Sequence, residues 1–180
     1  MIRTGIAMVC ALMNVINVSA QAHQEQPEEH HTSFKHWRVS GIISHTYIPT
    51  ENDGGKELVI VPSLGLDIEY WFSPRWAIGL HNDIEIETFE VEREKGSFVE
   101  RQFPLVFTLD ALWKPTHELV LLAGPGFEVE PEESFFVFRL GFEYELEFGD
   151  HWDVSPSAFY DYRADAFGTW SIGLGIGKRF

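Results

Sequence analysis

Cysteine is almost absent from this chain, whose 180 residues include only Cys10. Cys10 lies within an N-terminal segment that we expect to be removed, so the folded protein would contain no cysteine. This excludes disulfides, thiolate metal sites and a cysteine nucleophile. It also suits an exported protein that folds without covalent cross-links.

Positive charge is scarce as well. The chain has 13 Lys and Arg residues against 28 Asp and Glu, which gives a formal net charge of −15. Nucleic-acid binding demands a basic surface that neutralises phosphates, so this class of partner is excluded. We predict no cofactor.

No apolar run is long enough for a membrane-spanning helix, which needs about 20 residues. The longest, residues 6–18, follows Arg3 and precedes small residues that offer cleavage after Ala20 or Ala22. This is the pattern of a secretory signal peptide. We therefore predict a cleaved signal peptide over residues 1–22.

The segment 23–33 has almost no apolar residue and cannot bury anything. We expect it to be a disordered periplasmic lead-in to a single domain over residues 34–180. Its His23, His30 and His31 are compatible with weak binding of a transition metal, although we favour a simple solvated tail.

From Phe34 onward the sequence alternates with a period of two, and aromatic and β-branched residues are frequent. Apolar residues do not recur at helical spacing over three turns, so strands are favoured. We predict an all-β fold, an eight-stranded antiparallel up-and-down transmembrane β-barrel. The expected strands are residues 35–48, 57–72, 75–91, 102–113, 118–130, 134–148, 153–164 and 169–180.

The alternation gives each strand one large apolar face and one small or charged face. In the sixth expected strand the apolar face includes Phe136, Phe138 and Leu140, whereas Arg139 and Glu143 lie on the other. An eight-stranded barrel is barely wide enough to be filled by side chains, so the large rings cannot all fit inside. We therefore expect the apolar face to contact lipid and the polar face to fill the lumen.

The turns predict an orientation. Short connections at residues 73–74, 114–117 and 149–151 suit the periplasmic side, whereas 49–56, 92–101, 131–133 and 165–168 are longer on average and suit the outer side. Aromatic residues collect near the periplasmic strand ends, as expected for a girdle at the membrane–water boundary. These are Trp37, Trp71, Phe72, Trp76, Trp113, Phe148, Trp152 and Phe180.

The last strand, residues 169–180, alternates and ends in Phe180, which resembles the C-terminal signal of bacterial outer-membrane barrels. The segments 70–83 and 138–144 also look like an uncharacterised branch of the small outer-membrane barrels of Gram-negative bacteria. The resemblance implies outer-membrane lipids as partners and recognition of Phe180 by the barrel-assembly machinery. It implies no activity, and it leaves any surface ligand unknown.

Charged residues on the predicted lumen face must be paired or neutralised. We expect Arg38, Arg139 and Arg163 to lie in a ladder of carboxylates, with His36 and His81 as possible further cations. The carboxylates of this network are Asp67, Glu69, Asp83, Glu85, Glu143, Glu145 and Asp161. Other acids assigned to the same face are Glu87, Asp110, Glu128, Glu147 and Asp165.

Three alternatives stay open. A lipid-modifying acyl hydrolase needs a nucleophile beside a base, for which Ser44 with His45, or Ser63 with His81, are the candidates. A polar site of His81, Asp83 and Ser63, or a divalent ion held by His81, Asp83 and Glu85, is compatible with spacing by two. With the faces inverted, the chain would be a soluble periplasmic carrier of an apolar ligand. We favour a structural or surface-interaction protein of the outer membrane without catalysis or a bound metal.

Overall fold

The computed structural model describes residues 34–52, 55–92, 98–130, 133–164 and 166–180, and the signal peptide and lead-in expected before residue 34 lie outside these ranges. Phe34–Phe180 forms one compact unit. Its strands are β1 Trp37–Asn52, β2 Gly55–Ser73, β3 Trp76–Glu85, β4 Thr88–Glu92, β5 Phe98–Gln102, β6 Leu105–Trp113, β7 Leu119–Val129, β8 Phe135–Tyr144, β9 Leu146–Phe148, β10 Trp152–Arg163 and β11 Gly168–Arg179. Among the described residues, no helix is long and apolar enough to cross a membrane.

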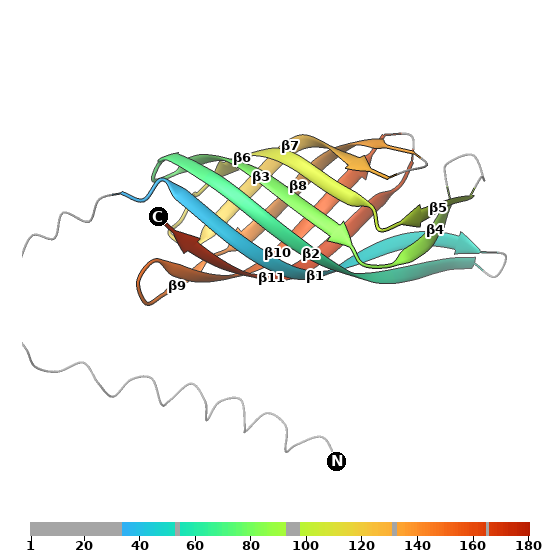
Figure 1. Cartoon of the computed structure of the whole chain (residues 1–180), viewed down its shortest axis with the longest axis horizontal. Helices are drawn as coiled ribbons and strands as arrows, with labels where there is room; N and C mark the ends of the chain where they lie inside the picture. The colour runs from blue at the N-terminus through green and yellow to red at the C-terminus, as the bar shows by residue number, and fades with distance from the viewer. Residues whose placement is uncertain (1–33, 53–54, 93–97, 131–132, 165) are drawn as a thin grey trace, which may run out of the picture. The chain divides into compact units, whose positions relative to one another are not determined.

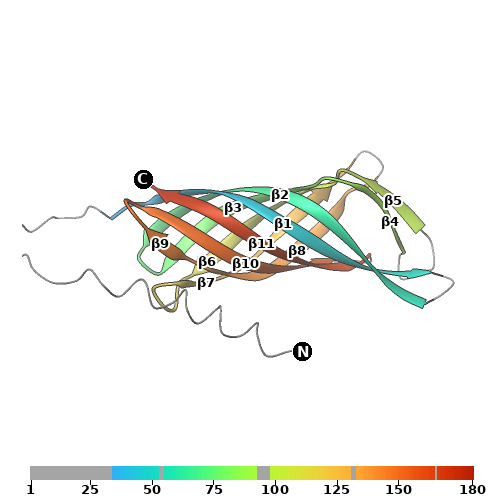
Figure 2. The same cartoon turned by 90° about the horizontal axis from the view of Figure 1, so that it is seen from below.

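The main sheet closes on itself (Figures 1 and 2). Its order is β11-β1-β2-β3-β6-β7-β8-β10, all neighbours are antiparallel, and β10 also pairs with β11. Strands β8 and β9 pair with successive parts of β10, so together they act as one strand of the barrel. The predicted fold, an eight-stranded up-and-down barrel, is confirmed.

The first and last strands close the barrel without a gap. Strand β1 pairs with β11 from Arg38↔Arg179 to Tyr47↔Trp170. Beyond this ladder, the backbone N–H of Phe180 donates to the carbonyl oxygen of Trp37 at 2.8 Å. Every barrel strand therefore has two neighbours, which removes the free edges that hydrocarbon does not tolerate.

The two ends of the barrel differ. Figure 1 shows the start of β1 and the C-terminus at one end, which we call the terminal end, and β4 and β5 at the other, the hairpin end. The connections at the terminal end are short. That between β9 and β10 contains Gly149 at φ +55° and His151 at φ +65°, a left-handed geometry typical of tight turns.

Two expected boundaries at the hairpin end are wrong. The predicted loop 49–56 is the continuation of the β1–β2 ladder, which runs to Asn52↔Gly55. The predicted third strand, 75–91, ends at Glu85, and its remainder forms β4, which pairs with β5 in a separate two-stranded sheet. The break faces Pro104, which lacks an N–H for the ladder, and Phe103, whose φ is +48°. The main sheet therefore ends at this point, and the chain bends into the separate β4–β5 hairpin.

The interior is not filled by polar groups alone. One buried apolar cluster comprises Ile42, Trp71, Ala77, Leu112, Val120, Leu122 and Phe159. A second comprises Ile48, Val61, Phe135, Ala166 and Phe167. The expectation of a lumen lined only by small or charged side chains is therefore corrected, because these apolar groups pack between the charged ones.

Candidate functional site

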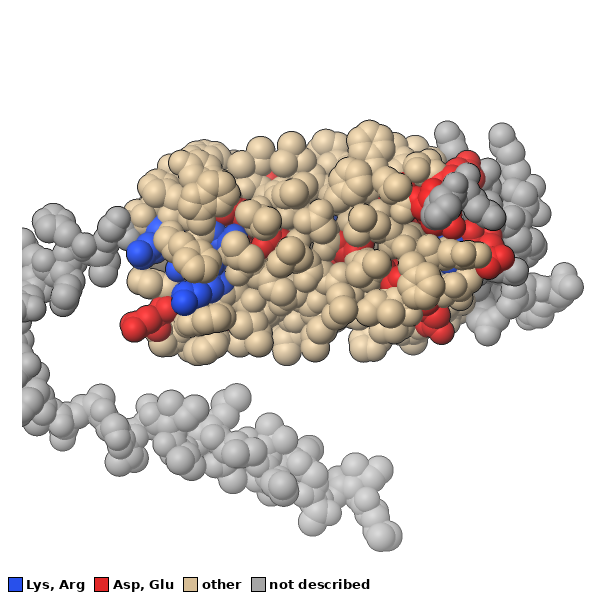
Figure 3. Space-filling view, viewed as in Figure 1, with Lys and Arg blue, Asp and Glu red and all other residues tan. Residues whose placement is uncertain are grey.

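The outer wall of the barrel is apolar. Phe138 is 39% and Ile172 56% exposed, whereas Arg139, adjacent to Phe138 in sequence, is only 2% exposed. On the face seen in Figure 3 the waist is covered mainly by uncharged side chains, with most visible Lys and Arg near the terminal end and most visible Asp and Glu toward the hairpin end. The prediction that the apolar face points outward is confirmed. A soluble carrier with its apolar face inside the barrel is therefore excluded.

The polar lumen is the candidate site, and its first layer lies at the terminal end. Glu145 accepts hydrogen bonds from Lys114 and, at 2.6 Å, from Nη2 of Arg179. The Lys114 and Arg179 cations lie 5.6 and 5.0 Å from the ring centroid of Trp71. Nε1 of Trp71 donates to Glu69 at 2.6 Å. The buried ring of Trp71 and the cations of Lys114 and Arg179 therefore fill the lumen at the terminal end.

Arg38 organises the next layer. Its Nε and Nη2 donate to the two oxygens of Asp153 at 3.0 and 2.7 Å, and Nη2 also donates to Ser155 at 3.1 Å. Its Nη1 binds Glu69 and, at 3.2 Å, Oε2 of Glu143. Because Arg38 is fully buried, its charge is compensated by carboxylates from three other barrel strands.

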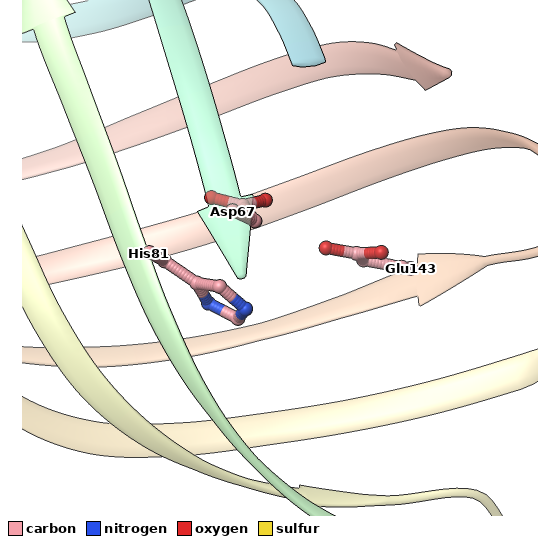
Figure 4. Close-up of side chains that lie close together, drawn as sticks. All are labelled: Asp67, His81 and Glu143. Carbon is pink, nitrogen blue, oxygen red and sulfur yellow. The ribbon is translucent and has the colours of Figure 1, made fainter. Parts of the chain in front are cut away.

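His81 lies in the middle of the barrel. It is the direct cross-strand partner of Asp67, and Glu143 approaches both from β8 (Figure 4). Its Nδ1 is 2.8 Å from Oδ2 of Asp110. The same Oδ2 accepts a 2.6 Å hydrogen bond from the hydroxyl of Thr108. This layer holds more acid than base.

Two arginines follow toward the hairpin end. Arg139 forms a bidentate pair with Asp161, and its Nη1 lies 2.6 Å from Asp83. The Nε of Arg163 binds Glu128, and its Nη1 donates to Thr169 at 2.9 Å. The lumen is thus bridged by cations that each bind carboxylates on other strands.

Arg101 forms the last layer. It comes from β5 and is fully buried, where it binds Glu128 and lies 2.6 Å from Oε2 of Glu130. Its guanidinium also lies 4.7 Å from the ring centroid of Phe135. The bend after β3 therefore places the β4–β5 hairpin so that the guanidinium of Arg101 lies against the mouth of the barrel.

The structure places most carboxylates of the expected ion-pair ladder beside an arginine, although Glu85 lies 3.9 Å from Arg163. Asp67 is the exception, because it lies with His81 and Glu143 instead. Two assignments to the lumen are wrong, because Glu87 and Glu147 are exposed where the strands break. His36 is also exposed, and its ring bonds the carbonyl oxygen of Trp71 at 2.8 Å. Asp165 lies outside the described residues.

The candidate catalytic pairs do not assemble. Ser44 is buried in the lumen, whereas His45 points to the outer wall, because neighbouring residues of a strand face opposite sides. A groove of about 450 Å³ on the wall is lined by His45, Ser44 and Ser63 among apolar residues, yet no hydrogen bond joins His45 to either serine within the described residues. The Ser63 hydroxyl bonds that of Thr46 at 2.9 Å instead of His81.

The two proposed combinations around His81 are corrected as well. Asp83 pairs with Arg139 and Glu85 lies near Arg163, so neither shares a site with His81. A site of His81, Asp83 and Ser63 is likewise absent from the described structure, because each of the three has a different partner. His81 instead lies with Asp67 and Glu143.

Sequence reasoning missed several members of the lumen network. Arg101 lies in the predicted loop 92–101 and Lys114 in the predicted turn 114–117, yet both pair with lumen carboxylates, as does Arg179 of the last strand. Trp71 was expected in the interfacial girdle but is 1% exposed. The alternation of β2 predicts the correct position, because Trp71 is two residues from Glu69 and four from Asp67 and so shares their lumen face.

No protein-family model and no curated protein matches the chain. Solved structures do. Ail, the attachment invasion locus protein of Yersinia pestis, is 14% identical, with a TM-score of 0.54 and coverage of 82% of this chain and 100% of Ail. Neisserial surface protein A is 10% identical (TM-score 0.53; coverage 80% and 97%). The N-terminal β-barrel domain of Pseudomonas aeruginosa OprF is 16% identical (TM-score 0.51; coverage 79% and 97%).

At these identities the likeness concerns the fold. The fold is that of small outer-membrane β-barrels, and the apolar outer wall and charged lumen of this chain fit that fold. The expected class and its outer-membrane location agree with this fold.

Proposed function

We propose that this barrel is a non-catalytic structural or surface-interaction protein of the outer membrane. The observation that carries the proposal is the cross-bridged lumen. From Arg179 at the terminal end to Arg101 at the hairpin end, successive layers of cations bind carboxylates on other strands. A narrow barrel filled in this way has no room for an aqueous channel.

The surface that remains for interaction is the hairpin end. The β1–β2 ladder and the β4–β5 hairpin both extend there, opposite the two termini (Figure 1). Ail has been solved in complex with sucrose octasulfate, an analogue of heparin. In this chain acidic side chains gather at the hairpin end (Figure 3), which disfavours such a polyanion and supports a cationic partner.

Assembly fits the same proposal. Phe180 lies beyond β11, is exposed, and has its backbone paired with Trp37 of β1. The assembly machinery would read this residue from the last strand, after export through the expected signal peptide 1–22. The terminal end would then face the periplasm, and both hairpins would face outward.

Planar-bilayer recording tests the sealed lumen. We expect the purified barrel to give no stepwise conductance, because its lumen is filled. The matched control is Arg139→Ala, which removes one of the cations that bridge the lumen. Uniform conductance steps from the wild-type barrel would contradict the proposal.

Surface labelling tests the orientation. An epitope inserted between β1 and β2 should be stained on intact cells, whereas one inserted between β2 and β3 should be stained only after the outer membrane is permeabilised. The reverse pattern would show that the hairpin end faces the periplasm and would remove the surface role.

A further inference from the structure

Three buried side chains in the middle of the lumen have polar atoms without a hydrogen-bond partner among the described residues. These atoms are Oδ2 of Asp67, both ring nitrogens of His81 and Oε1 of Glu143. The side chains come from β2, β3 and β8, they are at most 1% exposed, and they point toward one another (Figure 4). One ligand atom from each lies within 4.8 Å of the other two.

The surroundings of His81 prepare its ring for a ligand. Nδ1 lies 2.8 Å from Oδ2 of Asp110, which Thr108 holds through a 2.6 Å hydrogen bond. A carboxylate beside one ring nitrogen fixes the orientation of the imidazole ring. Histidine ligands of metals are commonly oriented by such a carboxylate.

The charge balance of this layer also calls for a cation. Asp67, Glu143 and Asp110 surround His81, and Arg38, the guanidinium that contacts Glu143, is shared among four carboxylates. These are Glu69, Glu143, Glu145 and Asp153. Uncompensated buried carboxylates are costly, and one divalent ion would neutralise two of them.

We propose that the lumen binds one divalent transition-metal ion, with Oδ2 of Asp67, Nε2 of His81 and Oε1 of Glu143 as protein ligands and Asp110 as the residue that positions His81. One imidazole and two carboxylates suit Zn²⁺ or a related ion, whereas Ca²⁺ takes at least six oxygen ligands. With bonds of about 2.0–2.2 Å at tetrahedral angles, ligand atoms on Zn²⁺ lie about 3.3–3.6 Å apart, so the three side chains must move closer than the 4.8 Å within which they now lie.

This site is independent of the proposed surface role, which requires no metal. It differs from the site expected from spacing alone, because Asp83 and Glu85 belong to the arginine pairs. Its residues are brought together by cross-strand pairing of β2 with β3 and by the approach of β8 across the lumen.

The test is metal uptake by the refolded full-length chain. The protein is refolded into detergent with Zn²⁺, dialysed, and its metal measured by mass spectrometry. We expect about one lumen ion per chain, and at least a tenfold loss of affinity in Asp67→Asn. The matched control, Glu85→Gln, removes another buried lumen carboxylate and should retain the ion. All three proteins share the N-terminal histidines, so the difference between them reports on the lumen.

Asp110→Asn should lower affinity about 10- to 100-fold without removing a ligand, as expected for a positioning residue. If Asp67→Asn does not fold, nitrogen NMR of the wild-type protein tests whether His81 binds the ion. Zn²⁺ should shift Nε2 of His81 and leave Nδ1 protonated. Wild-type affinity in Asp67→Asn, or an Nε2 resonance that Zn²⁺ does not move, would overturn the site and favour shared protons as the means of neutralisation.

Discussion

Arg139 and Asp161 stand directly opposite each other on β8 and β10 and form two parallel hydrogen bonds inside the barrel. Nε reaches Oδ1 and Nη2 reaches Oδ2, both at 2.7 Å. The third nitrogen, Nη1, lies 2.6 Å from Asp83 of β3. A single guanidinium therefore joins neighbouring strands and also bridges the lumen, and this arrangement recurs with Arg38 and Arg163.

Removing this guanidinium should be strongly destabilising. Arg139→Ala leaves the buried Asp161 and the half-buried Asp83 without their cation, and breaking a buried pair costs about 3–5 kcal/mol. Urea unfolding in lipid vesicles measures the change. The control Arg75→Ala removes an exposed arginine and should stay within about 0.5 kcal/mol of the wild type. Equal stability of the two variants would contradict a structural role for the lumen pairs.

Close packing of β6 against β7 predicts a second effect. A Cβ added at Gly124 would overlap the carbonyl oxygen of Leu109 and the backbone of Asp110, whereas one added at Gly41 meets nothing within 4 Å. Gly124→Ala should therefore lower the free energy of unfolding by about 1–3 kcal/mol, and Gly41→Ala should not. The same unfolding assay in vesicles compares the two variants. An unchanged free energy of unfolding in both would contradict the close approach of β6 and β7 at Gly124.

The lipid contact predicts an effect that depends on depth. Leu140 lies near the middle of β8, and Phe148 lies at the terminal end of β9, both exposed on the outer wall. Leu140→Arg should cost about 2–4 kcal/mol, and Phe148→Arg about 0–1 kcal/mol, because charge is least tolerated at the bilayer centre. Unfolding in lipid vesicles measures both free-energy changes. A larger loss of stability in Phe148→Arg than in Leu140→Arg would contradict the lipid contact.

The C-terminal residue offers a prediction about assembly. Phe180→Ala should reduce the heat-modifiable, folded form recovered from the outer-membrane fraction, because the assembly machinery would no longer recognise the last strand. Phe148→Ala removes another exposed phenylalanine from the terminal end and is the control. Equal yields of folded barrel from both variants would remove the special role of Phe180.

Most of the fold could be predicted from alternation, because each residue of a strand must face either lipid or lumen. Alternation correctly placed Phe138 outside and Arg139 inside. It failed where the backbone leaves the regular ladder. The bend near Phe103 and Pro104 ends the pattern before Glu87, and the pattern also ends before Glu147. The general preference of aromatic residues for strand ends led to the wrong position for Trp71, whereas the alternation of its strand places Trp71 in the lumen.

The lumen site was less predictable for a physical reason. Cross-strand neighbours such as Asp67 and His81 follow from register, which the short turn between β2 and β3 fixes. Contacts across the lumen, such as that of Glu143 with both, depend on the stagger of all barrel strands, and no local pattern encodes it. Arg101 was missed because its strand begins beyond the bend.

The most direct test of the account measures which face of β11 contacts lipid. Single nitroxide labels are placed at Ile172 and at its neighbour Ser171 in a Cys10→Ser background, and collisions with oxygen are measured in bilayers. We predict frequent collisions at position 172, which is 56% exposed on the outer wall, and few at position 171. Strong oxygen accessibility at 171 with protection at 172 would contradict the assignment of lipid and lumen faces.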